Sequence, residues 1–166
     1  MILLVLGGAR SGKSTVAEGR AASLAAGAGV TYLATAAAGG DADLGRRIDE
    51  HRARRPMDWT TVEVGTGLPG ALRETVGVAL VDGLGPWLAG SPSMVVDVDD
   101  LCSALGERAD DTVLVSDEVG LGVHPSTDSG RQFRDALGLV NQAVAASADE
   151  VLLVIAGRAL PLDRLR

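Results

Sequence analysis

ILLVLGGARSGKS, residues 2–14, is the stretch that decides the fold. Residues 7–14 fit the pattern G-x-x-x-x-G-K-[S/T], and the apolar residues before them predict a buried strand. A helix is expected to begin at Lys13, so that N–H groups of the loop and of the helix N-terminus surround a phosphate. Lys13 would reach the outer phosphates of a nucleotide, and the Ser14 hydroxyl would bind Mg²⁺. This strand–loop–helix setting favours a phosphate-binding loop over a chance glycine-rich turn.

The scarcity of lysine in the chain supports this interpretation. Lys13 is the only lysine in the chain, whereas fourteen arginines are present. A lysine at this one position indicates that a lysine is required there. Because no lysine follows Lys13, the N-K-x-D motif with which regulatory GTPases read guanine is excluded. Kinases, motor ATPases and nucleotidyltransferases remain as candidate classes.

Short apolar runs and helical patterns alternate along the chain. Strands are predicted at residues 2–6, 30–34, 78–81, 112–116 and 151–156, and helices at residues 13–26, 41–54, 68–75, 98–108 and 130–146. The strand runs are continuous rather than alternating, which predicts burial of both faces, as in a parallel sheet covered by helices. We therefore expect an α/β fold, a P-loop NTPase-type three-layer αβα domain with a mostly parallel central sheet, as a single domain over residues 1–166. Residues 83–93 are the hardest to assign, and we leave open that they are mobile.

Composition limits the function classes. The chain has 166 residues, a formal net charge of −7 and a single cysteine, Cys102. An acidic chain is a poor candidate for general nucleic-acid binding, and one cysteine excludes an internal disulfide and a cysteine-rich metal site. No apolar run approaches the ~20 residues needed to span a bilayer, and the first residues, MILLVLGG, carry no basic leader. We therefore expect a cytoplasmic protein without stable membrane insertion.

Three acidic residues follow predicted strands. A phosphate-binding loop needs a carboxylate near its metal ion, on a neighbouring strand, and Asp82 at the end of VALVD is the candidate for the Mg²⁺ site. A turn residue at the strand end is the alternative role for Asp82. Asp117 and Glu118 also end a strand and would point into the same crevice, because parallel strands present their carboxyl ends at one edge. Solvated loop acids are the alternative for this pair.

A second unusual stretch is RRIDEHRARRPMDW, residues 46–59, in which five arginines lie within residues 46–55 around one histidine, His51. Leu44, Ile48 and His51 share one face of the predicted helix, so a buried core histidine is one interpretation. The arginines favour another, because like-charge repulsion keeps the imidazole neutral and guanidiniums grip phosphate oxygens. A neutral imidazole can attack a nucleotide phosphate. A solvated charged face is the alternative for the arginines.

Five segments together resemble one known family. They are GGARSGKS (7–14), YLATA (32–36), RIDEHRARRPMDWTTVE (47–63), LVSDEVGLGVHP (114–125) and RQFRDALGLVNQAVAASADEVLLVIAG (131–157). In this order they resemble the bifunctional adenosylcobinamide kinase / adenosylcobinamide-phosphate guanylyltransferase family of cobalamin biosynthesis. The likeness runs over nearly the whole chain, and the combination is far more specific than any one segment.

The resemblance implies a transferase with two reactions. A nucleoside triphosphate, GTP or ATP, phosphorylates the aminopropanol hydroxyl of adenosylcobinamide. GTP then guanylylates a histidine, and the GMP passes to adenosylcobinamide phosphate to give adenosylcobinamide-GDP. The resemblance also implies Mg²⁺, a homotrimer, His51 as the guanylylated residue, Ser14 and Asp82 as metal ligands, and nucleotide contacts at Gly7, Gly8, Ala9, Arg10, Ser11, Gly12, Lys13, Ser14, Ala34, Thr35, Ala36, Arg52, Ala53, Arg54, Arg55, Glu63 and Asp82.

The chain departs from the family pattern at three positions. Asp117 stands where the family usually shows Asn, and Asp82 stands where some members have Glu. His124 stands at a position that is often apolar in relatives, and we interpret it as a loop residue rather than a second acceptor.

Two other functions stay open from the residues alone. A small-molecule P-loop kinase without guanylyl transfer would leave the arginines around His51 without a role. A nucleotide-sensing module would bind nucleotide without turnover. The nucleotide preference of the kinase step and the residues that hold the corrinoid are not determined by the sequence.

Overall fold

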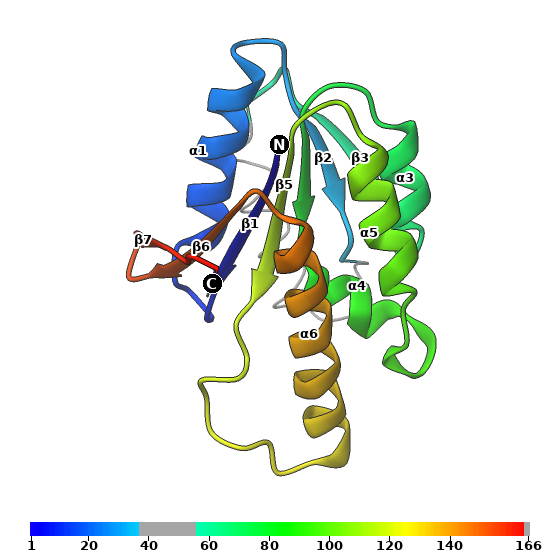
Figure 1. Cartoon of the computed structure of the whole chain (residues 1–166), viewed down its shortest axis with the longest axis vertical. Helices are drawn as coiled ribbons and strands as arrows, with labels where there is room; N and C mark the ends of the chain where they lie inside the picture. The colour runs from blue at the N-terminus through cyan, green and yellow to red at the C-terminus, as the bar shows by residue number, and fades with distance from the viewer. Residues whose placement is uncertain (37–55, 165–166) are drawn as a thin grey trace.

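The computed structural model describes residues 1–36 and 56–164 (Figure 1). The described helices are α1 (Lys13–Ala25), α3 (Leu68–Glu74), α4 (Leu84–Gly90), α5 (Val98–Glu107) and α6 (Asp128–Ser147), with the 3₁₀ turn η1 (Pro92–Met94). The described strands are β1 (Ile2–Gly7), β2 (Thr31–Ala34), β3 (Thr60–Glu63), β4 (Ala79–Asp82), β5 (Thr112–Asp117), β6 (Glu150–Ile155) and β7 (Arg158–Pro161). The predicted strands are confirmed within one or two residues at each end. The predicted helix at residues 41–54 lies outside the described residues.

The strands of the described residues form one seven-stranded sheet in the order β3-β2-β4-β5-β1-β6-β7. Strands β6 and β7 are antiparallel, and the other neighbouring pairs are parallel. The central strands β1 and β5 are buried along nearly their whole length. Continuous apolar runs therefore did indicate strands covered on both faces, and the predicted α/β fold with a mostly parallel sheet is confirmed.

Helices cover both faces of the sheet, which makes three layers (Figure 1). Helix α1 lies on one face and presents Ala17, Ala21 and Ala25, whose small side chains let it approach the strands closely. Helices α3, α4, α5 and α6 lie on the other face, over a larger core rich in leucine. The site at the carboxyl ends of the strands is therefore bordered by elements of both layers.

Helix α6 has 20 residues. It begins two residues earlier than the predicted range because the Thr127 hydroxyl accepts a hydrogen bond from Gly130 N (3.1 Å), which caps the first turn. Its buried face carries Leu137, Val140 and Val144, as the predicted spacing requires. No helix within residues 1–36 and 56–164 is both long and apolar enough to cross a membrane.

The segment that was hardest to assign, residues 83–93, forms α4 and η1. Gly83 turns the chain at φ 104°, a conformation that favours glycine. Leu84, Trp87 and Leu88 follow at i, i+3 and i+4 and are all buried, and Trp87 Nε1 donates to Thr66 O (3.0 Å). This short helical spacing is the signal that the sequence analysis missed, because Pro86 and the glycines around it read as a loop.

Strands β3 and β7 were not predicted. Both lie at edges of the sheet and are exposed along their whole length, so neither carries an apolar run. Their pairing depends on the neighbouring strand rather than on their own composition.

Arg108, which follows α5, joins the carboxyl end of α3 to the amino ends of β4 and β5. Its Nη1 donates to Leu72 O (2.6 Å) and Thr75 O (2.5 Å), its Nη2 to Gly77 O (2.7 Å), and its Nε to Thr112 Oγ1 (2.8 Å). Burial lowers the pKa of this guanidinium. One side chain therefore satisfies backbone carbonyls in the last turn of α3 and in the segment that leads from it to β4.

Replacing Arg108 should destabilise the fold without touching the nucleotide site. In Arg108→Met these carbonyls lose their donors, and we expect the free energy of unfolding to fall by about 2–3 kcal/mol. Urea denaturation followed by circular dichroism measures this change. Arg73→Met is the matched control, because Arg73 makes exposed ion pairs with Asp100 and Glu107. Its loss should lower the free energy of unfolding far less than the loss of Arg108 does. Equal losses in the two variants would contradict the role given to Arg108.

Candidate functional site

The loop between β1 and α1 has a shape that only certain residues allow. Gly12 precedes the helix at φ 93°, and Arg10 also has a positive φ, 56°. A Cβ on Gly7 would lie 2.5 Å from Ser11 Oγ and 2.8 Å from Val154 O, so no side chain fits there. The N-cap residue Gly12 has no side chain to cap α1, and the Ser11 hydroxyl accepts from Lys13 N (3.3 Å) in the first turn. A helix N-terminus that follows such a loop is suited to bind an anion, as predicted for residues 7–14.

Two distant backbone segments hold this loop in place. Glu118 N donates to Gly7 O (3.1 Å), and Gly157 N donates to Ser11 O (2.7 Å). The first bond comes from the end of β5, and the second from the turn between β6 and β7. The phosphate-binding loop is therefore supported from both neighbours of β1.

Lys13 lies at the first position of α1, as predicted, and already has two partners. Its Nζ lies 2.7 Å from Asp117 Oδ1 and 3.2 Å from Gly8 O. The side chain of Lys13 is 15% exposed, and that of Asp117 is 36% exposed. The ammonium is thus held over the loop, where phosphate oxygens would approach it.

Asp82 lies at the same edge of the sheet, but its strand is not the neighbour of β1. Strand β5 lies between β1 and β4, so the prediction of a directly neighbouring strand was wrong for Asp82. Strand β5 ends in Asp117, and the carboxylate of Asp117 contacts Lys13. Sequence spacing could not show this, because strand order depends on how the helices cross the sheet.

The end of β2 and the end of β4 are joined by side chains. The Tyr32 hydroxyl donates to the carboxylate of Asp82. The Thr35 hydroxyl lies 2.9 Å from Asp82 O and 2.7 Å from Gly83 O, and Thr35 is buried. Two hydroxyl groups therefore fix the turn that carries the predicted metal ligand.

The register of the sheet brings further predicted residues to this edge. Ala34 pairs with Asp82 on one side and with Glu63 on the other. Thr35 and Ala36 follow directly after β2. The structure therefore places these candidates at the carboxyl ends of neighbouring strands, while their contact with nucleotide remains a prediction.

Asn141 on α6 is a residue that sequence reasoning gave no role. Its Oδ1 accepts from the Ser116 hydroxyl (2.6 Å), and its Nδ2 donates to Asp117 O (3.1 Å). It is 8% exposed and ties α6 to the end of β5. A polar residue on the apolar face of α6 was the available signal. Glu118, predicted beside Asp117, instead accepts from Gly120 N (2.6 Å).

The predicted metal ligands fit Mg²⁺ in their chemistry. The Ser14 hydroxyl and the Asp82 carboxylate supply hard oxygen donors, and Mg²⁺ in such sites uses few protein ligands together with substrate phosphates. No group of three or more His, Cys, Asp or Glu able to hold a metal ion occurs within residues 1–36 and 56–164. A site completed by nucleotide phosphates is thus compatible with the described residues.

Comparison with known proteins assigns the chain to a family. The model of the family described as cobinamide kinase / cobinamide phosphate guanyltransferase matches residues 3–162. This chain belongs to that family. The family recognised from sequence segments is therefore confirmed.

Relatives in this cobinamide kinase / guanyltransferase family match over nearly their full length. The chain is 43% identical to the bifunctional adenosylcobalamin biosynthesis protein CobP of Pseudomonas aeruginosa, covering 96% of this chain and 95% of that protein. It is 33% identical to the corresponding CobU of Escherichia coli, covering 95% and 97% of the two chains.

Solved structures support the fold alone. The flagellar accessory protein FlaH from Methanocaldococcus jannaschii aligns with a TM-score of 0.55 at 15% identity, over 95% of this chain and 74% of that one. The ATPase domain of G40P aligns with a TM-score of 0.50 at 11% identity, over 92% and 68% of the two chains. Both alignments agree with the predicted P-loop NTPase-type fold.

Some family positions predicted for this site lie outside the described residues. They are His51, Arg52, Ala53, Arg54 and Arg55. The other histidine, His124, is described and exposed, with Nδ1 3.1 Å from Pro125 O in the loop before α6. The structure thus places His124 in a loop, as predicted.

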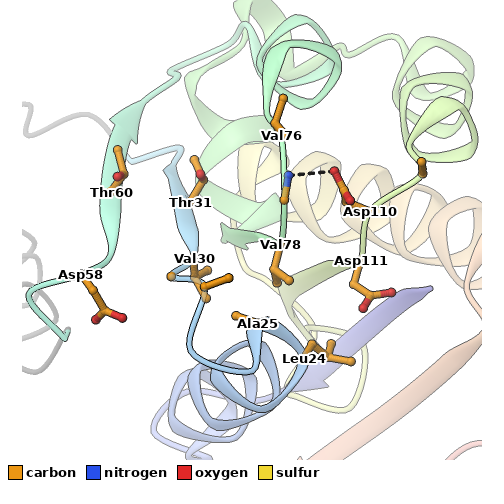
Figure 2. Close-up of a pocket in the computed structure, with 14 residues that line it drawn as sticks. Leu24, Ala25, Val30, Thr31, Asp58, Thr60, Val76, Val78, Asp110 and Asp111 are labelled. Atoms are coloured by element: carbon orange, nitrogen blue, oxygen red, sulfur yellow. Dashed lines mark hydrogen bonds between the residues drawn. The ribbon is translucent and has the colours of Figure 1, made fainter.

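A hollow of about 350 Å³ lies at the opposite end of the sheet from the phosphate-binding loop. Figure 2 shows the residues that line it. It lies among the amino ends of β2, β3 and β4, beside the end of α1. Two of its acids are already engaged, since Asp110 accepts from Gly77 N (2.7 Å) and Asp111 pairs with the N-terminal ammonium (2.8 Å). Ligands of open α/β sheets bind at the carboxyl ends, so we do not assign the family's nucleotide to this hollow.

Proposed function

We propose that this chain phosphorylates adenosylcobinamide with a nucleoside triphosphate and then transfers GMP from GTP to adenosylcobinamide phosphate. The observation that carries the proposal is the combination of family membership over residues 3–162 with a phosphate-binding loop of the required geometry. The relatives carry the name bifunctional adenosylcobalamin biosynthesis protein.

In the kinase step the protein acts by holding the phosphates of the nucleotide in position. N–H groups of residues 8–13 surround the phosphates, and Lys13 offsets the charge that moves toward the leaving nucleoside diphosphate. The Ser14 hydroxyl and the Asp82 carboxylate would hold Mg²⁺, which supplies Lewis-acid stabilisation of the phosphate charge when bound. The Tyr32 hydroxyl orients Asp82 for this role.

In the guanylyl step we propose His51 as the nucleophile. Its ring nitrogen attacks the α-phosphorus of GTP, so that a P–N bond forms and the P–O bond to pyrophosphate breaks. A phosphate oxygen of adenosylcobinamide phosphate then attacks the same phosphorus and displaces His51, which regains its neutral form. Arg52, Arg54 and Arg55 would hold phosphate oxygens during both displacements. Gly7 to Ser14, Ala34, Thr35, Ala36, Ala53 and Glu63 are proposed as the further nucleotide contacts.

The proposal includes a cellular setting and an assembly. We propose a cytoplasmic homotrimer with GTP, ATP and the corrinoid as its small-molecule partners, and no nucleic-acid partner. The acidic net charge of −7 supports the last point, because phosphate backbones attract basic surfaces.

Covalent labelling tests the guanylyl transfer. The protein is incubated with Mg²⁺ and GTP labelled at either the α- or the γ-phosphate, then denatured and counted. We expect acid-labile, alkali-stable label on the protein from the α-position and none from the γ-position, as a phosphoramidate with GMP requires. Adenosylcobinamide phosphate should then discharge the label. Absence of α-label with nucleotide binding intact would leave the alternative of a small-molecule kinase, or of a nucleotide sensor if no turnover occurs.

A further inference from the structure

Asp117 holds the lysine of the phosphate-binding loop. Its Oδ1 lies 2.7 Å from Lys13 Nζ, and the Lys13 side chain is 15% exposed. Among the described residues, the other partner of the ammonium is a neutral carbonyl, Gly8 O, at 3.2 Å. The positive charge that phosphates require is therefore already balanced by a carboxylate from the strand beside β1.

The position of this carboxylate is fixed by several elements. Asp117 pairs with Gly7 across β1 and β5, and its carbonyl accepts from Asn141 Nδ2 (3.1 Å). A Cβ on Gly85 would lie 3.0 Å from Asp117 Oδ2, so the first turn of α4 packs closely against the carboxylate. The backbone of Asp117 is therefore held beside the loop, which keeps the carboxylate near Lys13 when phosphate oxygens approach.

Binding of a triphosphate changes the charge balance at this point. Phosphate oxygens that take Lys13 as their partner leave Asp117 beside new negative charge, and Asp82 lies at the same edge of the sheet. Like charges this close repel strongly, because the effective dielectric at a partly buried site is far below that of water. A divalent cation that arrives with the nucleotide removes two of its negative charges and weakens this repulsion.

We propose that Asp117 makes the loop select triphosphates complexed with a divalent cation over the metal-free triphosphate. Asp117 acts through its charge beside Lys13 and is a specificity-determining residue that need not touch the ion. The inference rests on nucleotide binding at residues 7–14, which is part of the proposed function. This role explains why Lys13, the lysine proposed to bind the phosphates, forms an ion pair with Asp117.

Calorimetric titration with a GTP analogue bridged by methylene between the α- and β-phosphorus tests the inference. This analogue cannot guanylylate the protein, and no corrinoid is added, so only binding is measured. We expect Asp117→Asn to tighten the dissociation constant measured in EDTA by about 10-fold or more, and that measured with Mg²⁺ by less than about threefold. The preference for the Mg²⁺ form should therefore shrink.

Asp111→Asn is the matched control. Asp111 precedes β5 at its other end and forms an ion pair of similar length, 2.8 Å, with the N-terminal ammonium. The six residues of β5 separate the two carboxylates by about 20 Å, well beyond the screening length of about 10 Å in 0.1 M salt. This variant should keep the wild-type preference for the Mg²⁺ form, and so should Asp117→Glu, which retains the charge.

The outcomes separate the inference from the proposed function. An Asp117→Asn protein with an unchanged Mg²⁺ preference, or with equal loss of affinity for both forms, would overturn the inference and leave Asp117 as a structural support. Asp117→Ser removes the same charge and provides the measurement if Asp117→Asn does not fold, as judged by thermal melting. Failure of the wild type to bind either form would instead contradict nucleotide binding at the loop.

Discussion

Lys13→Ala is expected to lower the rate of both transfer reactions by about 10³-fold. Lys13 is the only lysine of the chain and lies over the loop, so no other ammonium can replace it beside the phosphates. The loss should appear mainly in kcat, because the charge on the phosphates increases toward the leaving group in the transition state. Steady-state kinetics of adenosylcobinamide phosphorylation and of GMP transfer measure the two effects.

Arg20→Ala is the control for this prediction. Arg20 lies on the same helix α1 and pairs with Glu150 at 3.0 Å, away from the loop. Its removal should change either rate by less than about threefold, because it affects only a partly exposed ion pair. If Lys13→Ala abolished phosphorylation but left GMP transfer intact, the two reactions would have to use different phosphate sites.

His51→Ala should separate the two reactions. Without the nucleophile, the rate of GMP transfer is expected to fall by about 10⁴-fold or more, and the covalent label from α-labelled GTP should disappear. Phosphorylation of adenosylcobinamide needs no covalent intermediate with the protein and should stay within about threefold of the wild-type rate. Product analysis by chromatography distinguishes the phosphate from the guanylylated product.

His124→Ala provides the matched histidine control, since the chain contains two histidines. His124 is exposed, and its ring contacts the neighbouring carbonyl of Pro125. This variant should retain the covalent label and both activities. Loss of label in His124→Ala with label retained in His51→Ala would show that the acceptor was assigned to the wrong histidine.

The parts of the fold that could be predicted are those determined by neighbouring residues. The strand before Gly7, the helix that begins at Lys13 and the apolar face of α6 all follow from local patterns, and the structure confirms them. The phosphate-binding loop belongs to this group, because its glycines are required by backbone geometry within a few residues.

Features that depend on strand order could not be predicted. The ion pair between Lys13 and Asp117 joins residues more than one hundred positions apart, and it forms because β5 lies beside β1. For the same reason Asp82 was predicted on a strand neighbouring β1, whereas β5 lies between its strand β4 and β1. Strands β3 and β7 carry no core residues, so their existence is visible only once β2 and β6 are in place.

The hydrogen bond from Gly157 N to Ser11 O has a consequence for the order in which the protein matures on the ribosome. Among the described strands β1 is translated first, whereas its partners β5 and β6 come late and are followed by β7 alone. A nascent chain that lacks residues 112–157 has an unpaired β1 and a loop without either backbone support. The loop therefore has both of its backbone supports only late in synthesis, after the turn at Gly157 has left the exit tunnel.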